Sequence, residues 1–501
     1  MSLQRLRDLP LLVLALLLLL PVGGVLAAWL QWDAQSADIL REMASTVLPR
    51  YAGASLALCL AVAVGTALVG TAGAAAVTLF EFPGRRSFEW ALLLPLAMPA
   101  YVVAYAYTDF LQFSGPMQTW LRAAFGLEGR VFPEVRNLPG AAWVFVFTLY
   151  PYVYLLARAA LSERAAHLME AARLLGASMR RRVLAVALPL ARPAIAAGTA
   201  LALMETLADF GVASYFGVQT FTAGIYKAWL VMDNRVAAAQ LATSLLLLVA
   251  LMLKLEQSAQ SRLRFANTSG GTHGSEAQAL RLHGAHAALA WALCSLPVLL
   301  GFGVPVLLLL TALAQAGDTG LPWMRFVDWT WNSLRLGAMT AVLAVGLALA
   351  LAYQARLRSH RLSRWAVQWA GLGYAVPGVV IVVGLLLPLG WLQQAWPASQ
   401  AGTWITATVL GLVWAYLVRF VAVALQSVQS GYARIPVSLD DSARMLGVTG
   451  WGLMRRVHAP LLQRTTIAAA LLVFVDVMKE LPATMVLRPF NSDTLAVVAY
   501  Q

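Results

Sequence analysis

The chain has 501 residues, of which 60% are hydrophobic and only 12% are charged, so the composition excludes an ordinary soluble multidomain protein and indicates a membrane protein. The net charge is +13, but the basic residues are dispersed between apolar runs and do not form one patch with aromatic residues, which argues against nucleic-acid binding. Cys59 and Cys294 fall within apolar runs and predict neither a disulfide framework nor a metal site.

The first apolar segment is about twenty residues long, enough to cross a bilayer of roughly 30 Å, so we expect an uncleaved first helix and not a signal peptide. Apolar segments then recur along the whole chain and predict eleven membrane spans. They lie near residues 9–30, 54–80, 88–110, 139–157, 193–218, 237–253, 287–315, 333–353, 365–389, 402–425 and 465–487.

The loops between these spans alternate in charge. With the N-terminus in the cytoplasm, about two thirds of the 36 Lys and Arg residues fall in inside loops, seven of them between Arg158 and Arg192. This asymmetry predicts a multi-pass membrane protein whose N-terminus and whose loops at residues 160–192 and 427–464 face the cytoplasm.

The sequence contains an internal repeat. Ser55 and Pro99 recur as Ser333 and Pro377, displaced by 278. Residues 256–286 are polar and rich in Ser, Gly and Thr, which predicts a cytoplasmic linker between a first repeat at 1–255 and a second at 287–501. Because the first repeat continues through one more apolar span than the second, we expect the chain to stop one helix short of twelve. Prolines within spans, such as Pro99 and Pro377, can loosen backbone hydrogen bonding where helices bend around a path, although packing against neighbouring helices is the simpler account.

One motif occurs in both repeats. Glu170, Gly176 and Pro189 recur at Asp441, Gly447 and Pro460, displaced by 271. Each copy predicts a short amphipathic helix that a left-handed glycine closes, followed by a second helix. Ser178 and Thr449 are candidate caps of that second helix, and Ser438 with Asp441 has capping-box spacing. The alternative is an amphipathic connector lying on the membrane surface.

The first copy, E-A-A followed by G and then L-P, is similar to the cytoplasmic EAA loop of bacterial ABC importer permeases. The second copy departs from the pattern, with Asp441-Ser442-Ala443 in place of E-A-A and Ala459 before its proline. Two such units in one chain resemble the fused ferric-iron permeases, whose relatives include thiamine permeases. The resemblance implies an all-α polytopic membrane protein of the bacterial inner membrane with the type I ABC importer permease fold, two fused repeats of about six helices.

In that family the EAA-like loops, here residues 160–192 and 427–464, are the sites of ATPase coupling. The resemblance therefore assigns this role to a set of residues in the two loops: Glu170, Ala171, Ala172, Gly176, Asp441, Ala443 and Gly447. It implies two copies of an ABC ATPase subunit, a periplasmic solute-binding protein and membrane lipid as partners. No G-x-x-x-x-G-K-[ST] motif occurs in the sequence, so we expect no cofactor in this chain, no enzyme activity, and ATP bound by the partner.

Two pairs of acids follow the loops within predicted spans, namely Glu205 with Asp209 and Asp476 with Glu480. Residues four apart share a helix face, and charge near the bilayer centre is costly, so these acids are candidates for a polar translocation path. Carboxylates also suit a hard cation such as ferric iron, although no metal site is assigned. The alternative is a structural role, for example a pair between Glu480 and Arg419.

The expected function is thus the permease subunit of an ATP-driven importer of ferric iron. Thiamine or another small solute is the alternative substrate. An ion-coupled secondary transporter that uses the four acids is a competing class, because such carriers also contain repeats. A membrane scaffold without transport would leave the four acids unexplained.

Overall fold

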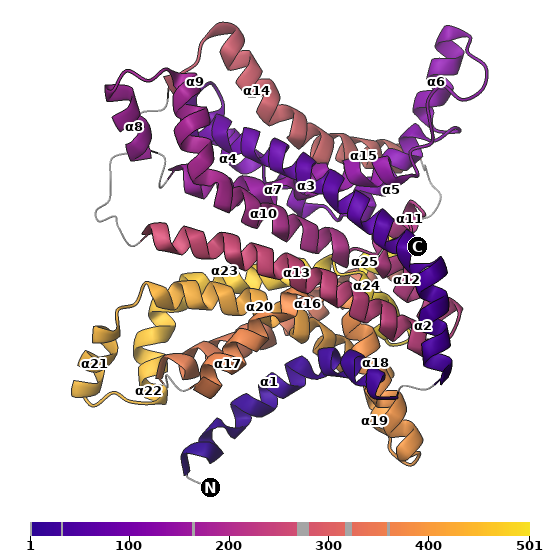
Figure 1. The fold of residues 1–501 in the computed structure, drawn as a ribbon, viewed down its shortest axis with the longest axis vertical. Helices are drawn as coiled ribbons and strands as arrows, with labels where there is room; N and C mark the ends of the chain where they lie inside the picture. Colours follow the sequence, from indigo (N-terminus) through magenta and orange to yellow (C-terminus); the bar gives the residue numbers. More distant parts are fainter. Residues whose placement is uncertain (1–2, 32–33, 163–165, 268–279, 316–322, 358–360) are drawn as a thin grey trace. The chain divides into compact units, whose positions relative to one another are not determined.

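A computed structural model describes residues 3–31, 34–162, 166–267, 280–315, 323–357 and 361–501, and these are helical almost throughout (Figure 1). The chain forms two compact units. Unit 1 contains residues 1–41, 225–246 and 320–501, and unit 2 contains residues 42–224 and 247–319. Each unit therefore includes chain from both sides of the predicted linker, and the units differ from the linear halves that the repeat defines.

Unit 2 is built on three long helices that pack against one another, α3 (Leu48–Leu79), α7 (Leu138–Ala160) and α10 (Leu188–Ala208). Small residues allow this packing, as is common between helices in membranes. A Cβ atom on Gly198 of α10 would lie 2.6 Å from Val153 Cα of α7. The backbones of the two helices thus meet where Gly198 has no side chain.

The other elements of unit 2 extend or cover this bundle. They are β1 (Phe80–Glu81), α4 (Arg85–Ala91), η2 (Leu94–Ala97), α5 (Ala100–Leu111), α6 (Pro116–Phe125), α8 (Ala166–Leu174), α9 (Met179–Arg182), η4 (Val183–Ala187), α11 (Gly211–Tyr215), β2 (Leu280–Arg281), α14 (Gly284–Val298), η6 (Leu299–Gly303) and α15 (Val304–Gln315).

Unit 1 repeats the same design with α16 (Trp323–Leu357), α20 (Val409–Ala433) and α23 (Ala459–Met478), which also pack pairwise. These helices occupy the positions of α3, α7 and α10 in the repeat register. In addition, α1 (Leu3–Ala27) packs along α18 (Gly378–Ala395), so closely that a Cβ atom on Gly384 would lie 1.8 Å from the carbonyl oxygen of Pro21. The first helix of the chain is thus packed against a helix of the second repeat.

The other elements of unit 1 are η1 (Ala28–Gln31), η5 (Lys227–Val231), α17 (Arg361–Gly371), η7 (Gly373–Ala375), α19 (Ala401–Thr406), α21 (Val437–Met445), α22 (Trp451–Leu453), η8 (Met454–His458), α24 (Pro482–Leu487) and α25 (Leu495–Tyr500). Helix α2 (Ala34–Thr46), helix α12 (Phe221–Tyr226) and helix α13 (Arg235–Asn267) each contribute residues to both units.

Ten described helices are long and apolar enough to cross a membrane, or up to eleven if a bent pair counts as one span. The bent pair joins Arg85–Ala97 to Ala100–Phe125 at 86°. Pro99 is the N-cap residue of α5 and Pro377 is the N-cap residue of α18, each directly after a short 3₁₀ turn. The prolines therefore stand at breaks between helices, inside segments that the sequence predicted as single spans.

The predicted linker at 256–286 is partly structured. Helix α13 continues to Asn267, and β2 pairs in parallel with β1 before α14 begins at Gly284. Residues 268–279 lie outside the described part of the chain. A polar composition alone did not show that both ends of this segment adopt regular structure.

Candidate functional site

The first EAA-like loop is a short helix closed by a glycine. Helix α8 ends at Leu174, and Gly176 has φ +78°, in the left-handed region. The Gly176 N–H donates to the Arg173 carbonyl (2.9 Å) and the Ala177 N–H donates to the Ala172 carbonyl (2.9 Å). This pair of bonds is the Schellman motif, so the predicted glycine closure is confirmed.

The second EAA-like loop is closed in the same way. Gly447 has φ +80°, its N–H donates to the Arg444 carbonyl (2.9 Å), and the Val448 N–H donates to the Ala443 carbonyl (2.9 Å). These four residues are the counterparts of the Schellman residues in the first loop. The two copies thus have the same local backbone structure although their E-A-A positions differ in sequence.

The N-caps predicted for the helices of the two loops do not form the expected capping hydrogen bonds. Ser178 occupies the N-cap position of α9, but its side chain makes no capping hydrogen bond. Thr449 is not a cap, because Gly450 with φ +54° takes that position before α22. The capping box is also wrong, since α21 begins after Pro436 and Ser438 lies inside the helix. In the second loop proline and glycine set the helix starts that hydroxyl residues were expected to set.

Each loop exposes two large apolar side chains immediately before its glycine. Leu174 and Leu175 are 82% and 88% exposed, and their counterparts Met445 and Leu446 are 89% and 83% exposed. The same pair of exposed apolar side chains thus occurs at the same place in both repeats. The acids of the two motifs form ion pairs on their own helices, Glu170 with Arg173 (3.6 Å) and Asp441 with Arg444 (3.2 Å).

The alanines of the motif differ in exposure. Ala443 is buried (8% exposed) and holds α21 against the unit, whereas Ala171 is exposed and Ala172 is half-buried. The two loops therefore share a tip of apolar side chains, an ion pair and a glycine closure. They differ in the contacts that hold the short helix, α8 or α21, against its own unit.

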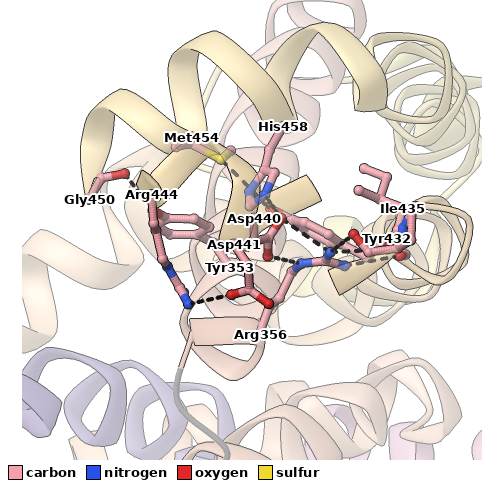
Figure 2. A network of polar contacts seen from close by, with 11 residues as sticks. Tyr353, Arg356, Tyr432, Ile435, Asp440, Asp441, Arg444, Gly450, Met454 and His458 are labelled. Atoms are coloured by element: carbon pink, nitrogen blue, oxygen red, sulfur yellow. Dashed lines mark hydrogen bonds and ion pairs between the residues drawn. The ribbon is translucent and has the colours of Figure 1, made fainter. Parts of the chain in front are cut away.

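A buried polar network holds the second loop (Figure 2). Asp440 lies in the first turn of α21 with 3% of its side chain exposed, and Arg356 lies at the end of α16. Arg356 Nε donates to Asp440 Oδ2 (2.7 Å) and Nη2 donates to Oδ1 (3.3 Å). The same guanidinium also donates to the carbonyls of Tyr432, Ile435 and Pro436, at 3.2, 3.0 and 3.2 Å.

His458, in η8, completes this network from the other arm of the loop. Its side chain is fully buried, and Nε2 lies 2.9 Å from Asp440 Oδ1. Because an ionised carboxylate only accepts hydrogen bonds, Nε2 carries the hydrogen. Nδ1 lies 3.3 Å from the Tyr432 hydroxyl, and Tyr353 of α16 donates to the Gly450 carbonyl at the start of α22.

Burial by itself raises the pKa of the Asp440 carboxyl. The hydrogen bonds from Arg356 and His458, with the charges of these two groups, outweigh burial and leave the pKa of Asp440 below its ordinary value. The carboxylate is therefore held in its charged form.

The first loop has no such network at the equivalent positions. Asp440, His458 and Tyr432 correspond to Met169, Ala187 and Leu161, which are 7%, 0% and 1% exposed and belong to one apolar core cluster. Helix α8 is thus anchored by apolar packing where α21 is anchored by charge. Sequence reasoning did not identify the network, although the repeat register held the signal. A comparison of the two copies shows Asp440 and His458 at positions that are apolar in the first.

The four intramembrane acids lie at helix ends. Asp209 is the C-cap residue of α10 and accepts from the Val212 N–H (2.8 Å), while Glu480 follows the end of α23 and accepts from the Ala483 N–H (3.1 Å). The Asp209 N–H donates to the Glu205 carbonyl (3.0 Å), so the first pair is one helical turn apart, as predicted. Glu480 instead lies one residue beyond Lys479, the C-cap of α23, so the second pair does not share one continuous helix. Asp209 and Glu480 thus each lie one residue before the N-cap of the next short helix, α11 or α24, and each carboxylate accepts from a backbone N–H of that helix.

Two of these acids form ion pairs with basic side chains. Glu480 is 4% exposed, its Oε1 lies 3.6 Å from Arg419 Nη1, and Asp476 pairs with Lys479 at 3.0 Å. Glu205 is half-buried in α10. The ion pair with Arg419 that the sequence allowed is thus present, and a role of the four acids in translocation stays a prediction.

Comparison with known proteins identifies this architecture. The model of the family described as "Binding-protein-dependent transport system inner membrane component" matches residues 67–264 and 343–487, more than half of the chain. The chain belongs to this family. Both matched segments include an EAA-like loop, so each repeat of this inner-membrane component is recognised separately.

Individual relatives agree with this assignment. This inner-membrane component is 25% identical over 454 residues to "Fe(3+)-transport system permease protein FbpB 2" of Haemophilus influenzae, covering 89% of this chain and 83% of the relative. It is 24% identical to "Probable ABC transporter permease protein y4fN" of Sinorhizobium fredii, covering 86% and 78%. A shorter match, 28% identical over 36% of this chain and 60% of the relative, is to "Maltose/maltodextrin transport system permease protein MalG" of Vibrio parahaemolyticus. The chain is therefore a multi-pass ABC permease component of the inner membrane.

Proposed function

We propose that this chain is the permease subunit of an ATP-driven importer and that its two EAA-like loops are the docking sites of two copies of an ATPase subunit. The repeated tip carries this proposal, with Leu174–Leu175 and Met445–Leu446 exposed directly before glycines that close the two helices in the same conformation. A surface that occurs twice suits a partner that binds twice. The tips would transmit movements of the ATPase pair to the bundles from which they project.

The local structure suits a mechanical role. The Schellman bonds at Gly176 and Gly447 fix the chain direction after each short helix, so the exposed pair keeps a defined orientation. Glu170, Ala171 and Ala172 of the first loop and Asp441 and Ala443 of the second lie on these helices. In this proposal the loops face the cytoplasm, as the distribution of basic residues predicts.

Ferric iron is the proposed substrate, delivered from the periplasm by a solute-binding protein. The support is the similarity over most of the chain to a permease whose name specifies Fe(3+) transport. Among the described residues, no three His, Cys, Asp or Glu side chains gather as candidate metal ligands, so the iron proposal rests on the relative and not on a ligand cluster. Thiamine or another small solute is the alternative, since the chain also matches a permease whose name specifies maltose transport.

Uptake measurements test the substrate. Cells lacking the gene and cells in which it is restored are compared for uptake of radiolabelled ferric iron, with and without ATP depletion. Restored uptake that disappears on ATP depletion supports both the substrate and the energy source. Uptake that follows an ion gradient and survives ATP depletion contradicts the importer and supports the secondary transporter, while unchanged iron uptake removes the iron assignment and directs the assay to thiamine.

Co-purification tests the docking surface. Leu175→Asp and Leu446→Asp each place a charge on one exposed tip and are expected to reduce the amount of ATPase subunit that purifies with the permease, and to reduce it most in combination. Leu127→Asp is the matched control, because Leu127 is also exposed (44%) but lies between α6 and α7, away from both loops. Equal recovery of the ATPase with all three variants would contradict the proposed docking sites.

A further inference from the structure

The two EAA-like loops expose the same apolar tip, but a charged network holds the second loop whereas apolar packing holds the first. In the second loop, Arg356 and Tyr353 lie three residues apart on one face of α16 and hold opposite arms of the loop. Arg356 holds the arm that enters α21, through the carbonyls of Ile435 and Pro436, and Tyr353 holds the arm that leaves it, at Gly450. Figure 2 shows both side chains reaching into the loop from the same helix.

Asp440 and His458 join these two arms to each other. The Asp440 carboxylate accepts from Arg356 on one side and from His458 on the other, and both Asp440 and His458 are almost wholly buried. The His458 ring also lies edge-on to Tyr353, with centroids 5.5 Å apart, and to Tyr432, with centroids 5.2 Å apart. A carboxylate with two charge-assisted or hydrogen-bonded partners at these distances restrains all three side chains strongly.

We propose that Arg356, Asp440 and His458 are positioning residues that fix the second coupling helix, α21, to the end of α16, so that movement of an ATPase at this loop reaches the bundle without loss. At the positions equivalent to Asp440 and His458 the first loop carries Met169 and Ala187, which pack in an apolar core. The two coupling helices are thus held by different chemistry. This inference rests on the proposed coupling function, and its test separates the two.

Hydrogen–deuterium exchange of the complete complex measures the anchoring directly. Asp440→Asn removes the charge but keeps the shape, and we expect α21 amides to exchange about tenfold faster or more, because one partner of a buried charged pair is lost. Helix α8 in the same molecule is the internal control and is expected to keep its exchange rate. If Asp440→Asn does not assemble, Tyr353→Phe removes only the hydroxyl contact to Gly450 and is expected to shift α21 in the same direction.

A quadruple variant replaces the whole network with the residues found at the equivalent positions of the first repeat. It distinguishes the loss of one buried partner from the absence of the network as such. Arg356→Thr, Tyr432→Leu, Asp440→Met and His458→Ala together install the residues found at Thr78, Leu161, Met169 and Ala187. Replacing the whole charged network by uncharged groups leaves no buried charge without its partner, whereas removing one member does. We therefore expect α21 exchange in this variant to return toward the wild-type rate.

The functional readout is the amount of substrate transported per ATP hydrolysed by the complex. In Asp440→Asn this ratio is expected to fall several-fold while the ATPase still co-purifies, and the quadruple variant is expected to recover most of it. Wild-type exchange of α21 in Asp440→Asn would overturn the anchoring, and faster exchange with an unchanged ratio would overturn its role in coupling. A complex that contains no ATPase would instead contradict the proposed function, while the exchange comparison would still test the anchor.

Discussion

Replacement of Gly447 by other residues tests how the coupling helix is closed. Gly447 has φ +80°, and a Cβ atom built there has no neighbour within 4 Å, so steric contact contributes nothing and only the backbone conformation matters. A residue with a Cβ atom in this conformation costs about 1–2 kcal/mol. Asn tolerates it better than Ala, and a β-branched residue tolerates it least. The expected order of closure stability is therefore Gly, Asn, Ala, Val.

The assay is hydrogen exchange of the amides that form the closure, those of Gly447 and Val448 in the second loop and of Gly176 and Ala177 in the first. A loss of 1–2 kcal/mol corresponds to about a five- to thirtyfold faster exchange if these amides open locally. Substrate uptake is expected to fall in the same order, and most in Gly447→Asp, which also places a charge beside the exposed apolar pair.

Two glycines serve as controls for this series. Gly53 and Gly346 also have no atom within 4 Å of a built Cβ, but they lie in the helices α3 and α16. Because Ala is favoured over Gly in a helix by about 0.5–1 kcal/mol, Gly53→Ala and Gly346→Ala are expected to retain or gain stability. Equal exchange in the Ala and Gly forms of position 447, or an equal loss of uptake at position 346, would refute the reasoning.

Three further predictions concern the bundles and the buried charges. Gly198→Ala is expected to destabilise unit 2 by about 1–3 kcal/mol and to lower its melting temperature, because the new Cβ atom would lie 2.6 Å from the Val153 backbone. Gly53→Ala is the control, since a Cβ atom there meets no other atom within 4 Å. An unchanged melting temperature in Gly198→Ala would contradict the close packing. Because the pKa of Asp440 is lowered, the network stabilises the fold above the ordinary carboxyl pKa of about 4, and this contribution is lost as pH falls through the folded-state pKa. The difference in melting temperature between wild type and Asp440→Asn is therefore expected to shrink toward acid pH. A difference that stays constant with pH would argue against the ionised carboxylate. Glu480→Gln is expected to destabilise unit 1 by about 3 kcal/mol, because it leaves the Arg419 charge buried without its carboxylate. The control is Glu134→Gln at the exposed pair with Arg130, which is expected to change the melting temperature little. Similar effects of the two variants would count against the buried pair.

The sequence predicted the features that depend on local chemistry. Gly176 and Gly447 follow the last apolar residues of short amphipathic helices, and only a left-handed residue closes a helix there, so their conformation followed from the pattern. Pro99 and Pro377 cannot continue a hydrogen-bonded helix, and both stand at helix starts. The repeat register then carried each prediction from one half of the chain to the other.

Features that depend on distant partners were not predictable in this way. Arg356 and Asp440 are 84 residues apart in sequence, and neither has an unusual local context. The ends of α10 and α23 were also missed, because apolar sequence continues past both helices while the backbone turns at Asp209 and Glu480. Tertiary contacts decide such positions, and a single sequence shows them only where the two repeats disagree.

The packing of α1 against α18 has a consequence for biosynthesis. About 350 residues separate the end of α1 from the start of α18, so translation at roughly 5–20 residues per second separates the two helices by roughly 20–70 seconds. During that interval α1 enters the membrane and remains in lipid without the helix on which it packs. Helix α1 is thus made long before the helix on which it packs, and an assembly factor that shields unpacked helices would have a long opportunity to bind there.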